Sequence, residues 1–180
     1  SGRYINFSMI TPLLEKYPFQ QIIFLGNSVK GIPINLYQVG NGRKKILIWS
    51  QMHGNESTTT KALFKVLKQL KTGDFLSELS IYIIPMLNPD GAELYTRVNY
   101  NKVDLNRDAY LLTQPESKCL RKAYDLVKPD YCFNLHDQRT IFSVAQTSQP
   151  ATISFLAPAY NQERSINDVR QQAMRLIVLM

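Results

Sequence analysis

The sequence predicts an α/β protein built around a largely parallel sheet. Strand-like apolar runs alternate with stretches of helical periodicity along the chain, an order that is typical of parallel sheets. Residues 46–50 form a strand-like run that is apolar without alternation from Ile46 to Trp49, as expected of a strand buried on both faces. With 180 residues, 44% of them apolar, the chain is long enough to bury one sizeable core, so we expect a single domain over residues 1–180.

The N-terminal part of the chain predicts a helix and a hairpin before the first buried strand. Apolar positions recur at helical spacing over residues 8–17 and stop at Pro18. Two β-rich runs, 21–25 and 34–39, flank a turn bounded by glycines, which indicates a β-hairpin. The strand at 46–50 then leads directly into a polar segment.

The middle of the chain continues the alternation of strand and helix. A helical pattern over residues 57–71 is closed by Gly73, and a second buried strand is expected at 81–86. The polar loop that follows, residues 88–108, is too long for a simple connector, and loops of this length usually carry function.

The C-terminal third predicts further strands and a last helix. A helix over residues 116–127 precedes a third buried strand, 131–135, which ends next to His136. Residues 141–146 and 152–156 are interpreted as two more strands. A helical apolar stripe closes the chain at Ile166, Val169, Ala173, Leu176 and Ile177.

Composition narrows the classes of partner. The formal net charge is +7 and the isoelectric point is near 9.4, yet the densest basic run is only Arg43, Lys44 and Lys45, next to a strand. Nucleic-acid binding needs a larger basic cluster, so we expect no nucleic-acid partner. No apolar run is long enough to cross a bilayer, and we expect no membrane association.

The cysteines and the ends of the chain bear on compartment and completeness. Cys119 and Cys132 imply no disulfide framework, and Cys132 lies in an apolar run where we expect a buried thiol. The chain shows no charged start followed by an apolar stretch and a small-residue cleavage site, so the cytoplasm is only a weak default, and secretion stays open if a signal peptide was removed. Residues 176–180 are apolar and carry no cap or polar tail, so we expect a domain truncated at its C-terminus.

Both histidines of the chain directly follow predicted strand regions, where open α/β sheets form their ligand crevices. His53 and Glu56 are three residues apart as the chain enters a helix, and His136 can add a third ligand from a neighbouring strand. Catalytic zinc takes three nitrogen or oxygen ligands and keeps a fourth position for water. We therefore expect one Zn²⁺ per chain, held by His53, Glu56 and His136. Two ordinary core or surface histidines are the alternative.

Four motifs occur in the order of one known family. They are His53-Gly54-Asn55-Glu56, Asn88-Pro89-Asp90-Gly91, Arg97 and Asp104-Leu105-Asn106-Arg107. Together they resemble the zinc carboxypeptidases, from the opening helix to His136. The resemblance implies a three-layer α/β/α fold with a mixed, largely parallel central sheet, and a zinc-dependent hydrolase that acts on peptides.

The resemblance also implies roles for the loop residues. Arg97 would face the scissile carbonyl and stabilise the developing oxyanion. Asn106 and Arg107 would bind the free C-terminal carboxylate of the substrate, Arg107 through its planar two-point fork. Asp104 would accept a hydrogen bond from the ring of His53 and fix its orientation. The alternatives are solvated loop arginines and a turn or helix-cap aspartate.

Residues 88–91 are assigned a structural role, because Asn-Pro-Asp-Gly is a turn signal in any context. Three departures from the family pattern are expected to matter. The general-base glutamate and the mobile tyrosine have no match, since Glu163 and Tyr160 lie outside any motif, and we expect almost no activity from this chain alone. Asp108-Ala109 and His136-Asp137-Gln138 also differ from the residues that are usual in the family at these positions.

Three functions follow as hypotheses. The first is a metallocarboxypeptidase that removes C-terminal residues from peptides. The second is a zinc-dependent hydrolase of N-acyl amino acids, similar to desuccinylases and aspartoacylases, although the Asn-Pro-Asp-Gly motif favours the peptidase. The third is a non-catalytic module that binds peptide C-termini, which the missing base would explain.

Overall fold

The computed structural model describes residues 2–70, 74–137, 143–144, 146–151 and 153–180. The contacts of the chain divide into two compact units, Ser1–Asp137 and Gln138–Met180. A single domain over the whole chain stays a prediction.

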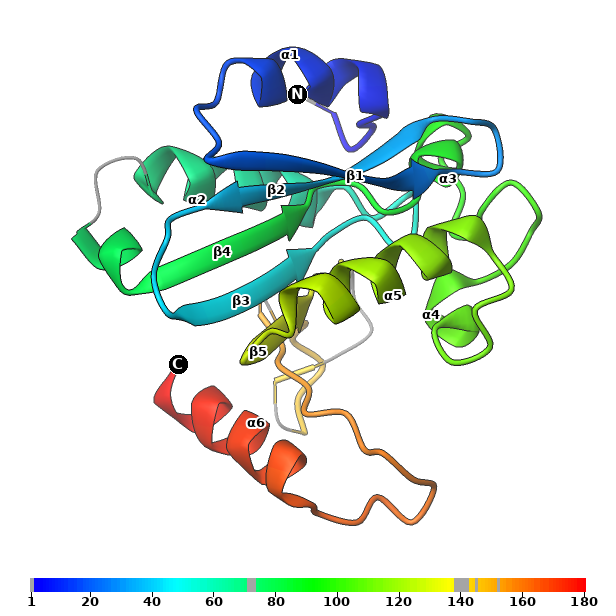
Figure 1. Cartoon of the computed structure of the whole chain (residues 1–180). Coiled ribbons are helices and arrows are strands. Elements are labelled where there is room, and N and C mark those ends of the chain that lie inside the picture. The colour runs from blue at the N-terminus through cyan, green and yellow to red at the C-terminus, as the bar shows by residue number, and fades with distance from the viewer. Residues whose placement is uncertain (1, 71–73, 138–142, 145, 152) are drawn as a thin grey trace. The chain divides into compact units, whose positions relative to one another are not determined.

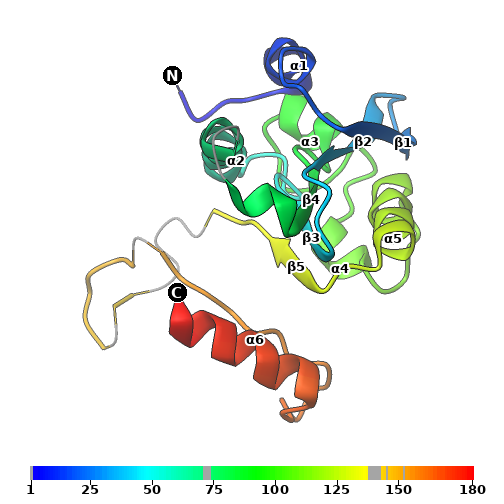
Figure 2. The same ribbon diagram turned by 60° about the vertical axis from the view of Figure 1, so that its left-hand side comes forward.

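Within the described residues, five strands of the first unit form one mixed sheet (Figures 1 and 2). In chain order they are β1 (Gln21–Asn27), β2 (Pro33–Val39), β3 (Lys44–Trp49), β4 (Leu79–Ile84) and β5 (Tyr131–Asn134), and their spatial order is β1-β2-β4-β3-β5. β1 and β2 form the predicted antiparallel hairpin, and β2 is also antiparallel to β4. β3 lies between β4 and β5 and is parallel to both. The predicted α/β class and mixed sheet are confirmed.

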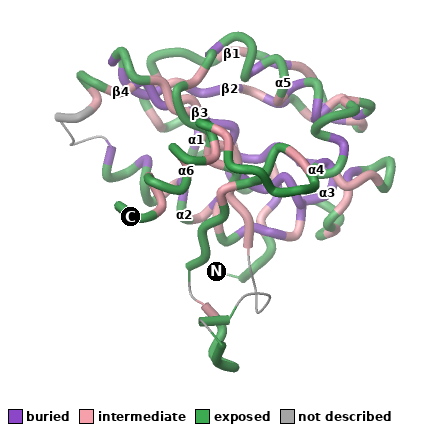
Figure 3. Tube along the Cα trace, turned by 90° about the horizontal axis from the view of Figure 1, so that it is seen from below, coloured by how far each residue is buried: buried purple, intermediate pink, exposed green. Residues whose placement is uncertain are grey.

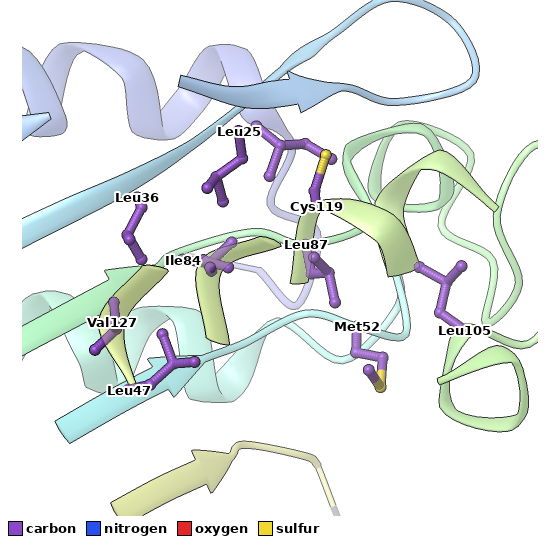
Figure 4. Packing of buried hydrophobic residues seen from close by; sticks show 11 residues of the cluster. Leu25, Leu36, Leu47, Met52, Ile84, Leu87, Leu105, Cys119 and Val127 are labelled. Carbon is purple, nitrogen blue, oxygen red and sulfur yellow. The ribbon is translucent and has the colours of Figure 1, made fainter. Parts of the chain in front are cut away.

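Helices pack on both faces of this sheet. They are α1 (Phe7–Glu15), α2 (Thr58–Leu70) and α5 (Pro115–Val127). Figure 4 shows the core on the α5 side, where Ile84 packs with Cys119 and Val127 of that helix. Ile83 belongs instead to the cluster that contains the buried leucines of α2, because successive side chains of a strand point to opposite faces. The three layers implied by the resemblance are therefore present.

Three short elements complete the first unit. A 3₁₀ turn, η1 (Asp74–Ser77), precedes β4, and the long polar loop after β4 contains α3 (Pro89–Glu93) and α4 (Leu105–Asp108). Figure 3 shows buried residues along β2 and β4. By residue, burial also covers 50–54, after β3, and 83–92, from β4 into α3.

The predicted burial of the third strand is wrong. β5 lies at the end of the strand order, where β3 is its only neighbour in the described sheet. Tyr131 is 41% exposed, and Cys132 is an exposed free thiol rather than a buried one. An apolar sequence therefore identified the strand correctly, but burial on both faces depends on the elements that pack against it.

In the second unit the predicted last helix is confirmed as α6 (Asp168–Leu179), with the Asn167 side chain accepting a hydrogen bond from the backbone N–H of Arg170 at 2.9 Å. None of the residues of α6 is buried. Residues 153–156 form no strand, since no described segment pairs with them, while residues 141, 142 and 145 of the predicted strand at 141–146 lie outside the described residues. None of the helices in the described part of the chain has the length and apolar character needed to cross a bilayer.

Candidate metal centre

The segment between β3 and α2 carries two of the predicted ligands in a turn that side-chain hydrogen bonds fix in place. Gln51 is fully buried and has a positive φ of 50°. Its amide nitrogen donates to the carbonyl of Gly54 at 2.8 Å, and its oxygen accepts from the hydroxyl of Thr60 at 2.8 Å. The backbone N–H of Glu56 donates to the carbonyl of His53 at 3.0 Å. His53 and Glu56 are thus presented by one well-anchored turn.

The same turn is attached to the N-terminal segment, residues 2–5. The side chains of Gln51, Ser57 and Lys61 donate to the main-chain carbonyls at positions 5, 3 and 2, respectively. The extended N-terminal segment therefore lies along the start of α2 and the turn before it.

His53, Glu56 and His136 come together, although His136 is far from the others in sequence. The parallel pairing of β3 and β5 places Trp49 opposite Asn134, so both chains leave the sheet at the same edge. Nδ1 of His53 lies 2.9 Å from Oε1 of Glu56, and Nδ1 of His136 lies 2.8 Å from Oε2. The centroids of the two imidazole rings are 4.7 Å apart.

The environment keeps Glu56 ionised. Burial raises the pKa of its carboxyl group, but hydrogen bonds from His136 and His53 and the charges of both rings outweigh burial and lower the pKa to about 2. A carboxylate that accepts from two imidazoles is an anionic oxygen donor at neutral pH, as a metal ligand must be.

The three side chains fit a zinc site. One potential donor atom from each residue lies within 4.8 Å of the other two, which is close to the reach of a single ion held about 2 Å from each donor. Nε2 of His53 lies 3.2 Å from Oδ1 of Asp104, so the ring nitrogen that faces away from Glu56 has a carboxylate partner. Zinc-binding histidines almost always have such a partner. Two imidazoles and one carboxylate are also a common ligand set of catalytic zinc.

Arg97 is brought to the edge of this cluster. Its Nε donates to Oδ2 of Asp104 at 3.1 Å, and one terminal nitrogen lies 3.4 Å from Oε1 of Glu56. The side chain is 48% exposed, so Arg97 lies at the boundary between these carboxylates and solvent. Burial raises the pKa of Asp104, and the hydrogen bonds and charges of His53 and Arg97 overcome this and lower it.

Asn106 and Arg107 lie on α4, which begins directly after Asp104. Asp104 caps this helix, because its side chain accepts from the backbone N–H of Asn106 at 2.9 Å. Both side chains are exposed. Among the described hydrogen bonds and ion pairs, neither side chain contacts the three clustered residues. Their predicted role in carboxylate binding stays a prediction.

The Asn88-Pro89-Asp90-Gly91 motif packs directly behind the turn of the metal centre. Asn88 caps α3 by accepting from the backbone N–H of Gly91 at 2.9 Å, and its amide nitrogen donates to the carbonyl of Met52 at 3.2 Å. A Cβ atom placed on Gly54 would lie 1.9 Å from the carbonyl carbon of Gly91. The two motifs therefore meet backbone to backbone.

Asp108, one of the departures from the family pattern, has a structural explanation. It is 3% exposed, and its carboxylate accepts from the backbone N–H and the hydroxyl of Thr113 and from the backbone N–H of Gln114. Asp108 thus ties α4 to the segment that leads into α5.

Sequence reasoning missed three contributors to this centre. They are the buried amide of Gln51, the backbone contact between Gly54 and Gly91, and Asp137, whose N–H donates to Glu56. The available signals were weak: a glutamine directly after a buried strand, and an acid directly after a predicted ligand. Neither residue type indicates such a role without the fold.

Comparison with known proteins places this geometry in a family. A family model described as zinc carboxypeptidase matches residues 8–164. Over 98 residues the chain is 33% identical to gamma-D-glutamyl-L-diamino acid endopeptidase 1 of Lysinibacillus sphaericus. This match covers 47% of the present chain and 25% of the relative. It is 29% identical over 140 residues to carboxypeptidase E of Caenorhabditis elegans, covering 59% of this chain and 30% of the relative. The chain thus spans about a quarter to a third of the length of these curated relatives.

Solved structures share the fold. A metallo-carboxypeptidase from Burkholderia cenocepacia superposes with a TM-score of 0.66 at 23% identity, covering 74% of this chain and 41% of that one. The murein-tripeptide amidase from Escherichia coli O157 gives a TM-score of 0.54 at 20% identity, covering 67% of this chain and 62% of that one. Because the family model spans most of the sequence, this protein belongs to the zinc carboxypeptidase family.

Proposed function

We propose that this chain is part of a zinc metallocarboxypeptidase that hydrolyses the last peptide bond of its substrates. The observation that carries the proposal is the convergence of His53, Glu56 and His136 beside Arg97. Zinc bound by this set would supply a Lewis acid and lower the pKa of a water molecule towards neutrality.

Each neighbouring residue has a role in this proposal. Arg97 faces solvent beside Glu56 and would stabilise the negative charge that develops on the carbonyl oxygen of the substrate. Asn106 and Arg107 would bind the C-terminal carboxylate of the substrate. Asp104 would hold the ring of His53 in one tautomer. No residue of this chain matches the general-base glutamate of the family, so we expect ligand binding rather than turnover from these 180 residues alone.

The metal is tested first. Elemental analysis of the purified chain should find about one zinc per molecule, and His53→Ala or His136→Ala should lose it. A protein that takes up no zinc, or that binds it equally well without either histidine, would overturn the proposed site.

The substrate is tested next, on zinc-loaded protein. A peptide with a free C-terminal carboxylate should bind more tightly than the same peptide with a C-terminal amide, and Arg107→Ala should remove the difference. Arg121→Ala, an exposed arginine of α5, is the matched control and should keep it. Equal binding of both peptides would argue against a carboxylate site.

A second candidate substrate comes from a relative. The 33% identity with a gamma-D-glutamyl-L-diamino acid endopeptidase favours a γ-D-glutamyl–diamino acid bond as the scissile bond. Measuring the affinity of the zinc-loaded protein for a γ-D-glutamyl–diamino acid peptide and for its α-L-glutamyl isomer separates the two candidates. Preference for the γ-linked peptide would replace the general carboxypeptidase proposal.

N-acyl amino acids and pure peptide binding are the remaining alternatives. The longer protein that this proposal implies is incubated with N-acyl amino acids and with peptides side by side, and mass spectrometry of the products separates these alternatives. Hydrolysis of the acyl amino acids alone supports the deacylase. Carboxylate-dependent binding without hydrolysis by the longer protein supports a non-catalytic module.

A further inference from the structure

Glu56 and His136 are 80 residues apart in the sequence, yet their carboxylate and imidazole meet at 2.8 Å. Glu56 lies just before α2, and His136 lies just after β5. The spacing of these two candidate ligands therefore depends on what ties the start of α2 to the end of β5.

Asp137 makes that connection at two points. Its backbone N–H donates to Oε2 of Glu56 at 3.3 Å. Its side-chain Oδ2 accepts from the backbone N–H of Thr58, the first residue of α2, at 3.2 Å. The residue next to His136 thus contacts both the candidate ligand Glu56 and the helix that begins two residues later.

Among the described hydrogen bonds, the acceptor of this N–H at the start of α2 is the carboxylate of Asp137. The first turn of the helix contains no acidic residue. Ser57, whose carbonyl accepts the first intrahelical bond from Lys61, donates its hydroxyl to the carbonyl of Arg3. Asp137 therefore supplies, from the segment that follows β5, the carboxylate that a helix N-terminus usually takes from its own cap or first turn.

β5 also needs anchoring, because β3 is its only neighbour in the described sheet. At its start, Oδ2 of Asp130 accepts from the backbone N–H of Lys45 at 2.8 Å. Asp130 and Asp137 thus tie opposite ends of one edge strand to the rest of the unit. Only Asp137 lies beside the candidate ligands.

We infer that Asp137 is a positioning residue that sets the spacing of Glu56 and His136 by binding the N-terminus of α2. The inference rests on the proposed zinc site. The inference gives Asp137, part of the His136-Asp137-Gln138 departure from the family pattern, a physical role. Its side chain acts on the metal centre through the backbone of Thr58.

The test measures zinc dissociation constants of the 180-residue chain by competition with a chromophoric chelator. Asp137→Ala should weaken zinc binding about tenfold or more, the effect usual for partners of metal ligands. Asp137→Asn keeps an oxygen that can accept from Thr58 and should restore most of the affinity. Thr58→Pro removes the N–H that Asp137 binds and suits the first helical position, so it should reproduce the loss seen with alanine.

The double variant supplies the decisive comparison. If Asp137 acts through Thr58, then Asp137→Ala in the Thr58→Pro background should change the affinity by no more than about twofold. Cobalt-substituted protein should show an altered visible spectrum in each single variant that weakens binding, since the spectrum reports the ligand geometry.

Asp130→Ala is the matched control for a purely structural role. It removes the corresponding carboxylate-to-backbone bond at the other end of β5, so it should lower the free energy of unfolding while leaving zinc affinity unchanged. Wild-type affinity in Asp137→Ala, or additive losses in the double variant, would overturn the inference alone. Failure of the unaltered chain to bind zinc would overturn the proposed site and this inference together.

Discussion

Gly54 and Gly91 pack backbone against backbone, joining the turn that carries His53 and Glu56 to the Asn-Pro-Asp-Gly motif. A side chain on Gly54 would place its first carbon 1.9 Å from the carbonyl carbon of Gly91 and 2.2 Å from the nitrogen of Ala92. Main-chain atoms cannot rotate away as a flexible side chain can, so the two segments would have to separate.

Gly54→Ala should therefore damage both stability and metal binding. We expect the free energy of unfolding to fall by about 1–3 kcal/mol or more, the usual effect of overpacking. Zinc affinity should fall as well, since Gly54 lies between two candidate ligands. Urea unfolding and chelator competition measure the two effects.

Gly31→Ala is the control for that substitution. Gly31 has a positive φ of 86° but no atom near the position of an added Cβ, so alanine should cost about 1 kcal/mol through the backbone alone and leave zinc binding intact. Equal effects of the two substitutions on zinc affinity would contradict the role assigned to the glycine contact.

Asp104→Asn should weaken zinc binding about 10- to 100-fold, because Asp104 partners the ring of His53. The variant keeps an oxygen that can cap α4, so the helix should survive and the change in unfolding free energy should be small. Asp125→Asn, on an exposed position of α5, should change neither quantity. Unaltered zinc affinity in Asp104→Asn would show that the contact has no influence on the metal.

Added zinc should stabilise the folded protein. At a free concentration about 100 times the dissociation constant, the gain should be about 2.7 kcal/mol in the free energy of unfolding. His136→Ala should abolish the gain. Magnesium should not reproduce it, because that ion prefers an all-oxygen site. Thermal unfolding with and without each ion measures the effect, and equal stabilisation by both ions would speak against a nitrogen-rich site.

Asp108 should make the free energy of unfolding depend on pH in the acidic range. Burial raises the pKa of this carboxyl group, but hydrogen bonds from Thr113 and Gln114 outweigh burial and lower it below the ordinary value of 3.8. The ionised group therefore stabilises the fold fully above its unfolded pKa, and the contribution is lost as the pH falls through the lower folded pKa.

Asp108→Asn should remove this dependence and reduce the unfolding free energy at pH 7 by about 1–3 kcal/mol, because the buried donors lose a charged acceptor. Urea unfolding between pH 3 and pH 7 should show a shallower acid slope for the variant. Parallel slopes would mean that Asp108 binds protons equally in the folded and unfolded states.

Much of the fold could be predicted because its signals are local. The hairpin of β1 and β2 follows from a turn bounded by glycines, and α2 follows from apolar spacing. The meeting of His53 and His136 could also be predicted, since neighbouring parallel strands end at the same edge of a sheet.

The remainder depends on contacts between distant segments. The exposure of β5 follows from its place in the strand order, which no local pattern specifies. The close approach of Gly54 to Gly91 likewise requires knowledge of which loops lie side by side. Long-range packing of this kind decides burial and register, while residue periodicity decides only the type of element.

Residues 2–5 are held by donors from Gln51, Ser57 and Lys61, which flank or belong to the turn of the metal centre. Detaching this segment would leave three side-chain donors without these acceptors and would weaken the anchoring of the start of α2. Proteolytic trimming, or a bulky fusion partner attached just before it, would therefore reach the metal-binding turn without touching a single ligand.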